Sequence, residues 1–293
     1  MTQKKEFQEL DLQDAFLFAA VLEDPETCRL VLELIFGRDI GSVNVQVERS
    51  GLFSKDFRYV RFDVYAAEKV NVVYNLEMQN AHKEQLPKRA RFHQAEMDAT
   101  YLKPGQTFQE LPESAVVFIC TFDPFHSNLY RYVFEERCQE TGEHLGDGTL
   151  KIFLSTVGSN EADVPPELVH FLRYVVSSTT KCAEDTRDAR IQDLNRRVEA
   201  LKRSRRLKEE YMTMQEMLND SRTEAREEGL AEGLAEGRAK GIAEGKAEGK
   251  SEGEDKILTL MSLMIRDGHP LDPEKLKNDK TFREEMFKKY QLS

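Results

Sequence analysis

The chain opens with two stretches in which apolar residues recur every three or four positions, the period of a helix with one buried face. Both lie in "LQDAFLFAAVLEDPETCRLVLELIFG", residues 12–37, where Asp24-Pro25 interrupts the pattern and Gly37 follows it as a helix C-cap would. The pattern predicts two consecutive helices, the second over residues 25–36.

Apolar and polar residues then alternate with a period of two, which indicates strands. Three consecutive strands are predicted at 42–50, 59–67 and 72–79. Residues 84–102 return to a helical pattern that Pro104-Gly105 closes, and the apolar run at 114–122 predicts a buried strand. Further elements are predicted at 129–137 and 149–156 (strands, with Gly146-Asp147-Gly148 as the turn between them) and at 167–178 (a helix). The order helix, strand, strand, strand, helix, strand indicates an α/β fold.

From about residue 184 the composition changes. Residues 184–226 are charged and favour helix, and glycine then recurs every fourth residue over 227–254. Since four residues advance a helix by about 400°, these glycines drift around the axis and form no fixed seam. Two interpretations are open, a weakly helical linker or an oligomerising coil with close glycine contacts. We expect a first domain over 1–180, a charged helical segment over 181–226, the glycine repeat over 227–254 and a small helical tail over 255–293, whose two helices part at Gly268-His269-Pro270.

Composition narrows the classes of function. The 293 residues carry a formal net charge of −11, so a non-specific affinity of the whole chain for nucleic acid is not implied, although a local basic patch could still bind a polyanion. The four cysteines form no Cys-x-x-Cys pair, which argues against a zinc site or a disulfide framework. The N-terminus lacks the apolar segment of a secretory signal, and the apolar run at 115–122 is too short to span a bilayer. We expect a cytoplasmic protein without membrane association.

The stretch "YNLEMQ", residues 74–79, carries an acid and an amide in a predicted strand. If this strand pairs as a hairpin with the strand before it, apolar residues must oppose apolar residues, because opposite residues share a face of the sheet. A connection of about five residues then places Asp63 opposite Glu77. Parity puts Tyr74, Leu76 and Met78 on the core side and leaves Glu77 and Gln79 facing outward together.

Two carboxylates from adjacent strands on one face repel each other and require a counter-charge. A divalent cation is one solution, since oxygen ligands suit Mg²⁺ or Mn²⁺. The alternative is an ordinary solvated strand face on which Arg61 neutralises Glu77 diagonally. Spacing alone leaves both interpretations open.

The same residues resemble a known family. Asp63 followed by "EMQ" at 77–79, within "RYVRFDVYA", "VVYNLEMQN" and "KRARFHQAEMDATYLKPG", is similar to the PD-(D/E)XK nucleases, in the branch of nuclease-family transposases and recombination-promoting nucleases. The resemblance covers about residues 10–155 and extends to the "AEG" repeats. It implies a restriction-endonuclease-like α-β-β-β-α-β core with a mixed sheet, here followed by a long C-terminal helical extension.

The resemblance also implies roles for individual residues. Asp63 and Glu77 would hold Mg²⁺ (or Mn²⁺), and Gln79 takes the place of the usual lysine, orienting water without contributing a charge. Glu33 or Asp14 would supply an additional acid. Alternatively, Glu33 is a solvated residue and Asp14 caps a helix.

Basic side chains follow the candidate site. Arg89 matches a recurrent family position and is the best candidate for a phosphate ligand, with Lys88, Arg91 and the weaker Gln94 beside it. An ordinary charged helix surface is the alternative. A second run, residues 187–208, has nine basic and three acidic residues and fits a nucleic-acid backbone as well as a charged coiled-coil face.

The resulting hypothesis is a Mg²⁺-dependent DNA endonuclease that hydrolyses phosphodiester bonds, with a link to recombination or mobile elements. Its partner would be DNA, and the C-terminal helical region could form a homo-oligomer. The alternative is a non-catalytic binding or assembly protein on a degenerate nuclease scaffold, which the absent lysine and the acidic chain favour.

Overall fold

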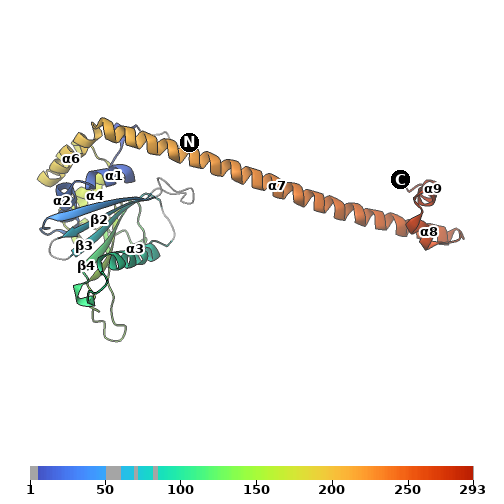
Figure 1. Ribbon diagram of the computed structural model, residues 1–293, viewed down its shortest axis with the longest axis horizontal. Coiled ribbons are helices and arrows are strands. Elements are labelled where there is room, and N and C mark those ends of the chain that lie inside the picture. Colours follow the sequence, from blue (N-terminus) through green and yellow to red (C-terminus); the bar gives the residue numbers. More distant parts are fainter. Residues whose placement is uncertain (1–5, 51–60, 69–71, 82–84, 293) are drawn as a thin grey trace. The chain divides into compact units, whose positions relative to one another are not determined.

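The computed structural model describes residues 6–50, 61–68, 72–81 and 85–292 (Figure 1). Within these residues the strands form one six-stranded sheet in the order β1-β2-β3-β4-β6-β5. The strands are β1 (Val43–Ser50), β2 (Arg61–Glu68), β3 (Val72–Gln79), β4 (Glu113–Cys120), β5 (Arg131–Phe134) and β6 (Thr149–Ser155). β1, β2 and β3 are antiparallel neighbours, β3, β4 and β6 run parallel, and β5 is antiparallel to β6. The sheet is therefore mixed.

The helices of the first part of the chain cover both faces of this sheet. They are α1 (Ala15–Leu22), α2 (Pro25–Phe36), α3 (Leu86–Tyr101), α4 (Pro166–Val176), α5 (Thr180–Thr186) and α6 (Ala189–Lys202). Short 3₁₀ helices occur at η1 (Phe7–Glu9), η2 (Phe108–Glu110) and η3 (Glu161–Asp163). The order α2-β1-β2-β3-α3-β4 confirms the restriction-endonuclease-like core predicted from the sequence.

Two hydrophobic cores lie on opposite faces of the sheet. The larger core contains Tyr74, Leu76 and Met78 of β3 and the apolar faces of α1, α2 and α4. The smaller core contains Val73 of β3 and lies under α3. Figure 1 shows α1, α2 and α4 on one side of the strands and α3 on the other. β3 is thus covered on both faces, as the parallel strands of α/β proteins are.

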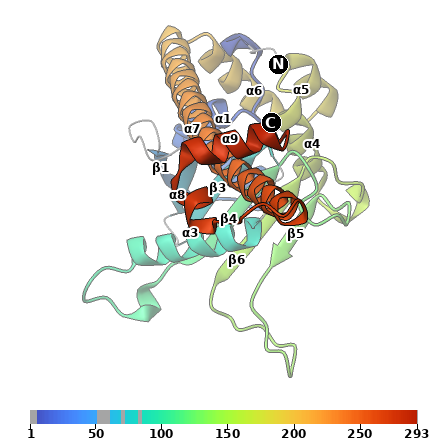
Figure 2. The ribbon, with the colours of Figure 1, turned by 90° about the vertical axis from the view of Figure 1, so that its right-hand side faces the viewer.

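The connection between β5 and β6 is longer than the turn at Gly146-Asp147-Gly148 that the sequence predicts. Gly146-Asp147-Gly148 ends the connection between β5 and β6, but the whole connection runs from residue 135 to residue 148 and forms a bridge between Arg137 and His144. Figure 2 shows this long excursion beyond the ends of the strands. The two glycines at 146 and 148 have φ angles of 71° and 74°, so they adopt the left-handed conformation that glycine tolerates best.

The glycine repeat is helical throughout. It lies inside α7, which runs without a break over Arg205–Arg266. A Cβ atom added at any glycine from Gly229 to Gly253 would meet nothing within 4 Å, so these glycines make no close contact with the described part of the chain. The repeat is therefore helical, and the two interpretations, a linker and an oligomerising coil, stay predictions.

The chain divides into two compact units, Met1–Asn219 and Asp220–Ser293. The second unit holds the rest of α7 with α8 (Pro273–Asn278) and α9 (Lys280–Lys289). The predicted separation at Gly268-His269-Pro270 lies between α7 and α8, and two short helices follow it. Leu260, Met264 and Leu276 form the buried core of this unit.

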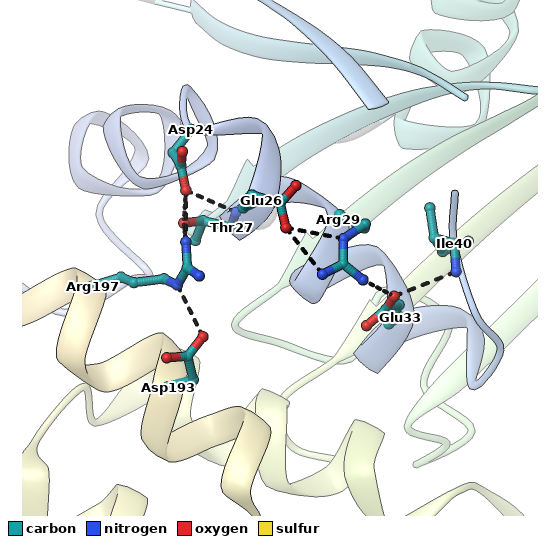
Figure 3. A network of polar contacts seen from close by, with 8 residues as sticks. All are labelled: Asp24, Glu26, Thr27, Arg29, Glu33, Ile40, Asp193 and Arg197. Atoms are coloured by element: carbon teal, nitrogen blue, oxygen red, sulfur yellow. Dashed lines mark hydrogen bonds and ion pairs between the residues drawn. The ribbon is translucent and has the colours of Figure 1, made fainter. Parts of the chain in front are cut away.

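A polar network attaches α6 to the start of α2 (Figure 3). Arg197 of α6 donates from Nη1 to Asp24 Oδ2 at 2.8 Å and to Thr27 Oγ1 at 3.2 Å, and from Nε to Asp193 at 3.0 Å. Asp24 caps α2 by accepting from the Thr27 amide. Burial by itself would raise the pKa of Asp24, but hydrogen bonds from Thr27 and the Arg197 guanidinium outweigh it and lower that pKa.

This lowered pKa gives a pH-dependent contribution to stability. A carboxylate whose folded pKa lies below its unfolded value stabilises the fold above the unfolded pKa and loses that contribution as the pH falls through the folded pKa. We expect Asp24→Asn, which can still cap α2, to flatten the acid limb of the stability curve. Because Asp24 is half exposed, the change at neutral pH should stay within about 1 kcal/mol.

Urea unfolding of the full chain between about pH 6 and about pH 2.5 measures this difference. Asp39→Asn, at an exposed residue two positions beyond Gly37, is the matched control and should leave the acid limb unchanged. Equal acid limbs for Asp24→Asn and wild type would contradict the role of the network.

Candidate functional site

The pairing of β2 and β3 fixes the position of Asp63. The ladder runs from Glu68 opposite Val72 to Val64 opposite Leu76, which is the register that parity predicts from the sequence. Asp63 is the next residue of β2 and therefore occupies the position opposite Glu77. On its other side Asp63 pairs with Glu48 of β1. The side chain of Asp63 lies outside the described part of the structure.

Glu77 and Gln79 are buried, with 6% and 5% of their surface exposed. The expectation that they face outward into solvent is therefore wrong, although they do share the face opposite Tyr74, Leu76 and Met78. The reason is the topology of the sheet. Since β3 and β4 are parallel, the chain must cross over between them, and the crossover helix α3 packs on the polar face.

Arg89 of α3 neutralises this buried polar pair. Its guanidinium donates from Nη2 to Glu77 Oε1 and from Nη1 to Gln79 Oε1, the latter at 2.8 Å. The Arg89 guanidinium carbon also lies 5.4 Å from the centre of the Phe118 ring, a cation–π arrangement. Gln79 donates in turn to the Ala81 carbonyl at 2.6 Å. Arg89 thus fixes the orientation of both side chains through one planar group.

A buried histidine adjoins the same carboxylate. His93, one helical turn after Arg89, has no exposed surface. Its Nε2 lies 3.2 Å from Glu77 Oε2, and its Nδ1 lies 3.2 Å from Glu96 Oε2. The sequence places His93 near the site but gives it no role, because a histidine inside a helix carries no distinctive spacing. Its burial and its two carboxylate neighbours appear only in three dimensions.

The other basic and amide candidates on α3 separate into two groups. Lys88 and Arg91 are exposed to solvent. Gln94 is buried instead and donates to the side chains of Asp98 and Ser114. The surface of α3 near the site thus offers Lys88 and Arg91 to a large anionic ligand, whereas Gln94 contributes to packing between α3 and β4.

The two additional acids have local partners. Asp14 caps α1, accepting from the Phe16 and Leu17 amides at 3.0 and 3.2 Å. Asp14 is therefore a helix cap, as the alternative interpretation expected. The backbone carbonyl of the neighbouring Gln13 accepts a hydrogen bond from the Asn80 side chain, which places this cap near the end of β3. Glu33 of α2 binds Arg29 at 2.5 Å and accepts from the Ile40 amide (Figure 3). Its helix packs on the sheet face opposite Glu77.

The second basic run is largely occupied by acids of the same chain. Arg190, Arg196, Arg197, Lys202, Arg205 and Arg206 all form ion pairs with aspartate or glutamate. The geometry therefore favours the charged helical face over a nucleic-acid track in this segment.

The donor set at β3 fits a divalent cation in part. Glu77 Oε2 is buried and accepts no hydrogen bond from the described residues, and His93 Nε2, which would form an ion pair with it when protonated, lies 3.2 Å away. Among the described residues no three His, Cys, Asp or Glu side chains gather as a metal site. The β2 register places the backbone of Asp63 opposite Glu77, and the metal-ligand role of the two residues stays a prediction.

The fold and this polar face define an α/β protein of the restriction-endonuclease-like class. A family model described as PD-(D/E)XK nuclease family transposase matches residues 45–228, more than half of the chain, and the chain belongs to this family. The match begins after the start of the resemblance seen in the sequence, at about residue 10, and covers the segment between residue 155 and the glycine repeat as well. No curated protein and no solved structure matches the chain. Within the described residues, no helix is long and apolar enough to cross a membrane.

The pairing of Arg89 with Glu77 gives a stability prediction. Removing one partner of a buried ion pair leaves the other charge uncompensated and costs about 3–5 kcal/mol. We expect Arg89→Met to destabilise the chain by about 3 kcal/mol, since Arg89 is partly exposed. The double variant Arg89→Met/Glu77→Gln should recover most of this loss because neither charge of the pair remains buried.

Urea unfolding of the two single variants, the double variant and wild type forms a double-mutant cycle for this pair. Lys88→Met, at an exposed cation one residue away, is the control and should change the free energy of unfolding by less than about 0.5 kcal/mol. Additive effects in the cycle would show that the two side chains do not stabilise each other.

Proposed function

We propose that this chain is a divalent-metal-dependent DNA endonuclease that hydrolyses phosphodiester bonds. The observation that carries the proposal is the buried Glu77 carboxylate, whose Oε1 is held by Arg89 while its Oε2 accepts no hydrogen bond from any residue that the structure describes. Nucleases of the PD-(D/E)XK superfamily typically use divalent metals, and this carboxylate stands where the resemblance implies a metal ligand. Asp63 and Glu77 would hold Mg²⁺ or Mn²⁺.

The metal would supply Lewis-acid stabilisation of the phosphoryl oxygen and a more acidic bound water. The residues of the chain provide the positioning. Glu77 is held rigid by Arg89 on a strand that is buried on both faces, so its Oε2 has a fixed direction. Fixed donors and acceptors need no reorganisation during the reaction, which is the source of most electrostatic catalysis.

Gln79 supports the proposal as the residue that orients water. Its side-chain oxygen accepts from Arg89 and its nitrogen donates to the Ala81 carbonyl. An amide offers two N–H groups and two lone pairs, so one of each is left for a water molecule or a phosphate oxygen. The two contacts with the protein set the direction of the remaining pair.

Lys88 and Arg91 support DNA as the substrate. They are exposed on α3 directly beside Arg89, and Phe92 between Arg91 and His93 is 56% exposed. Exposed cations bind phosphates and release counterions, and an exposed aromatic ring can stack on a base. A link to recombination or mobile elements rests on the family alone.

A cleavage assay tests the proposal. The full chain with Mg²⁺ or Mn²⁺ should cut DNA, whereas Asp63→Ala and Glu77→Gln should each lower the rate by at least about 100-fold. Thermal unfolding of the same preparations shows whether each variant is folded, so that loss of activity is not caused by unfolding. Glu113→Gln, at an exposed acid on β4, is the matched control and should cut as wild type does.

DNA cleavage that survives both substitutions would contradict the assignment of Asp63 and Glu77 to the catalytic site. Complete absence of cleavage by folded wild type, with either metal and with single- and double-stranded DNA, would favour a second candidate. That candidate is a binding or assembly protein, which the exposed apolar side chains of Leu230, Leu234 and Ile242 on α7 support. This second candidate includes a homo-oligomer formed through α7, which a measurement of the molar mass in solution would detect.

Binding of DNA gives a separate prediction. The double variant Lys88→Glu/Arg91→Glu should weaken DNA binding and reduce the slope of log affinity against log salt by about 2, one unit for each lost phosphate contact. Fluorescence anisotropy with a labelled duplex in a metal-free buffer measures both quantities. Arg196→Glu, in the second basic run where Arg196 pairs with Asp193, should leave the slope unchanged.

A further inference from the structure

Buried polar atoms without a hydrogen-bond partner gather in the layer between β3 and α3. Five such side-chain atoms occur among the described residues, and this layer holds four of them: two belong to Asn75, one to Glu77 and one to Gln94. In Asn75 both Oδ1 and Nδ2 lack a partner, and none of the residue is exposed. Burying an amide without hydrogen bonds destabilises a fold. Residues that break a packing rule in this way are found at functional sites, so Asn75 is a candidate for a function.

Asn75 lies on the face of β3 that carries the candidate site. It is two residues before Glu77, and alternation along the strand puts both on the side that α3 covers. Its opposite residue in β2 is Tyr65. Asp63 is the next residue of β2 on that face and is therefore a diagonal neighbour of Asn75. Such neighbours have Cα atoms about 7–8 Å apart and Cβ atoms somewhat closer, so side chains can meet across the diagonal.

The described polar groups around Asn75 are held by other partners. Arg89 binds Oε1 of Glu77, and Gln94 donates from Nε2 to Asp98 and Ser114. Neither Glu77 nor Gln94 forms a hydrogen bond with Asn75. The amide of Asn75 therefore keeps its two N–H donors for an acceptor on the β2 side of the layer. A carboxylate is the acceptor that an N–H group binds most strongly.

We propose that Asn75 is a positioning residue of the metal site, whose Nδ2 donates to the Asp63 carboxylate and orients it toward the ion that Asp63 and Glu77 would hold. The inference rests on the proposed function and extends it to a residue outside the pattern of Asp63, Glu77 and Gln79. Carboxylates that bind a metal are themselves hydrogen-bonded, and these outer partners fix their orientation. The amide thus favours the metal-bound state, whereas its burial is unfavourable in the metal-free chain.

Replacement of Asn75 by valine and by threonine tests this, because the two side chains have the same branching and differ in one hydroxyl donor. Urea unfolding of the full chain without metal should give a higher midpoint for Asn75→Val than for wild type, since an apolar group replaces an unpaired amide. Calorimetry with Mn²⁺ alone should show about 10-fold to 100-fold weaker binding by Asn75→Val. Asn75→Thr keeps a donor and should bind Mn²⁺ more tightly than Asn75→Val does.

Asn195→Val is the matched control. Asn195 of α6 is also buried, but its Oδ1 accepts from the Tyr174 hydroxyl at 2.9 Å and its Nδ2 donates to Thr180 at 3.2 Å. The control variant should lower the urea midpoint, because it leaves buried polar groups without partners, and should bind Mn²⁺ as wild type does. An amide that serves only the fold cannot shift stability upward and metal affinity downward when it is removed.

The outcomes separate this inference from the proposed function. Equal Mn²⁺ affinity of wild type and Asn75→Val, with binding abolished by Asp63→Ala, would overturn the inference and leave the nuclease proposal standing. A lower urea midpoint for Asn75→Val would overturn it as well, because Asn75 would then stabilise the fold through partners within the chain. Equally weak binding by the valine and threonine variants would exclude the hydrogen bond. A wild-type chain that binds no Mn²⁺ would contradict the proposed function and the inference together.

Discussion

The structure around the site depends on one constraint, which is that a carboxylate buried inside a sheet needs a compensating cation. Glu77 is buried because β3 and β4 are parallel and the crossover helix α3 packs over the polar face between them. The same helix supplies Arg89, whose guanidinium binds Glu77 and Gln79 together. The parallel crossover thus buries the Glu77 carboxylate and also brings the Arg89 cation to it. Substitution of Arg89 should therefore affect the stability of the fold as well as the site.

The two oxygens of Glu77 have different environments, and the proposed function depends on this difference. Oε1 is neutralised by Arg89, whereas Oε2 lies beside His93 and accepts no hydrogen bond from the residues described. A carboxylate with both oxygens paired would be structural, and one with neither oxygen paired would be too costly to bury. The fold is thus satisfied through one oxygen, and the other is the oxygen that would bind a cation in the proposed nuclease.

Local pattern predicts much of this arrangement from the sequence. The strands, α2, α3 and the register that places Asp63 opposite Glu77 follow from periodicity and parity, since a one-residue slip would turn Tyr74, Leu76 and Met78 away from the core. The outward orientation of Glu77 was wrong because parity assigns a face but cannot say what covers it. The sequence also did not predict the contact of His93 with Glu77 or the ion pair of Arg197 with Asp24. Both contacts join separate elements, α3 with β3 and α6 with the start of α2, and such contacts do not show in the hydrophobic period of either element.

The same contacts bear on why glutamine stands at position 79. A lysine there would place a second cation against the Arg89 guanidinium, which already donates to the residue at this position. With Gln79, the positive charge at the site comes from α3 and reaches β3 through the two donor groups of Arg89. The glutamine side chain accepts a hydrogen bond from the Arg89 guanidinium and keeps an N–H for another ligand. A lysine ammonium could not accept from Arg89, because it has no acceptor. In the proposed nuclease, Gln79 and Arg89 would therefore divide the tasks of charge and orientation that a single lysine combines.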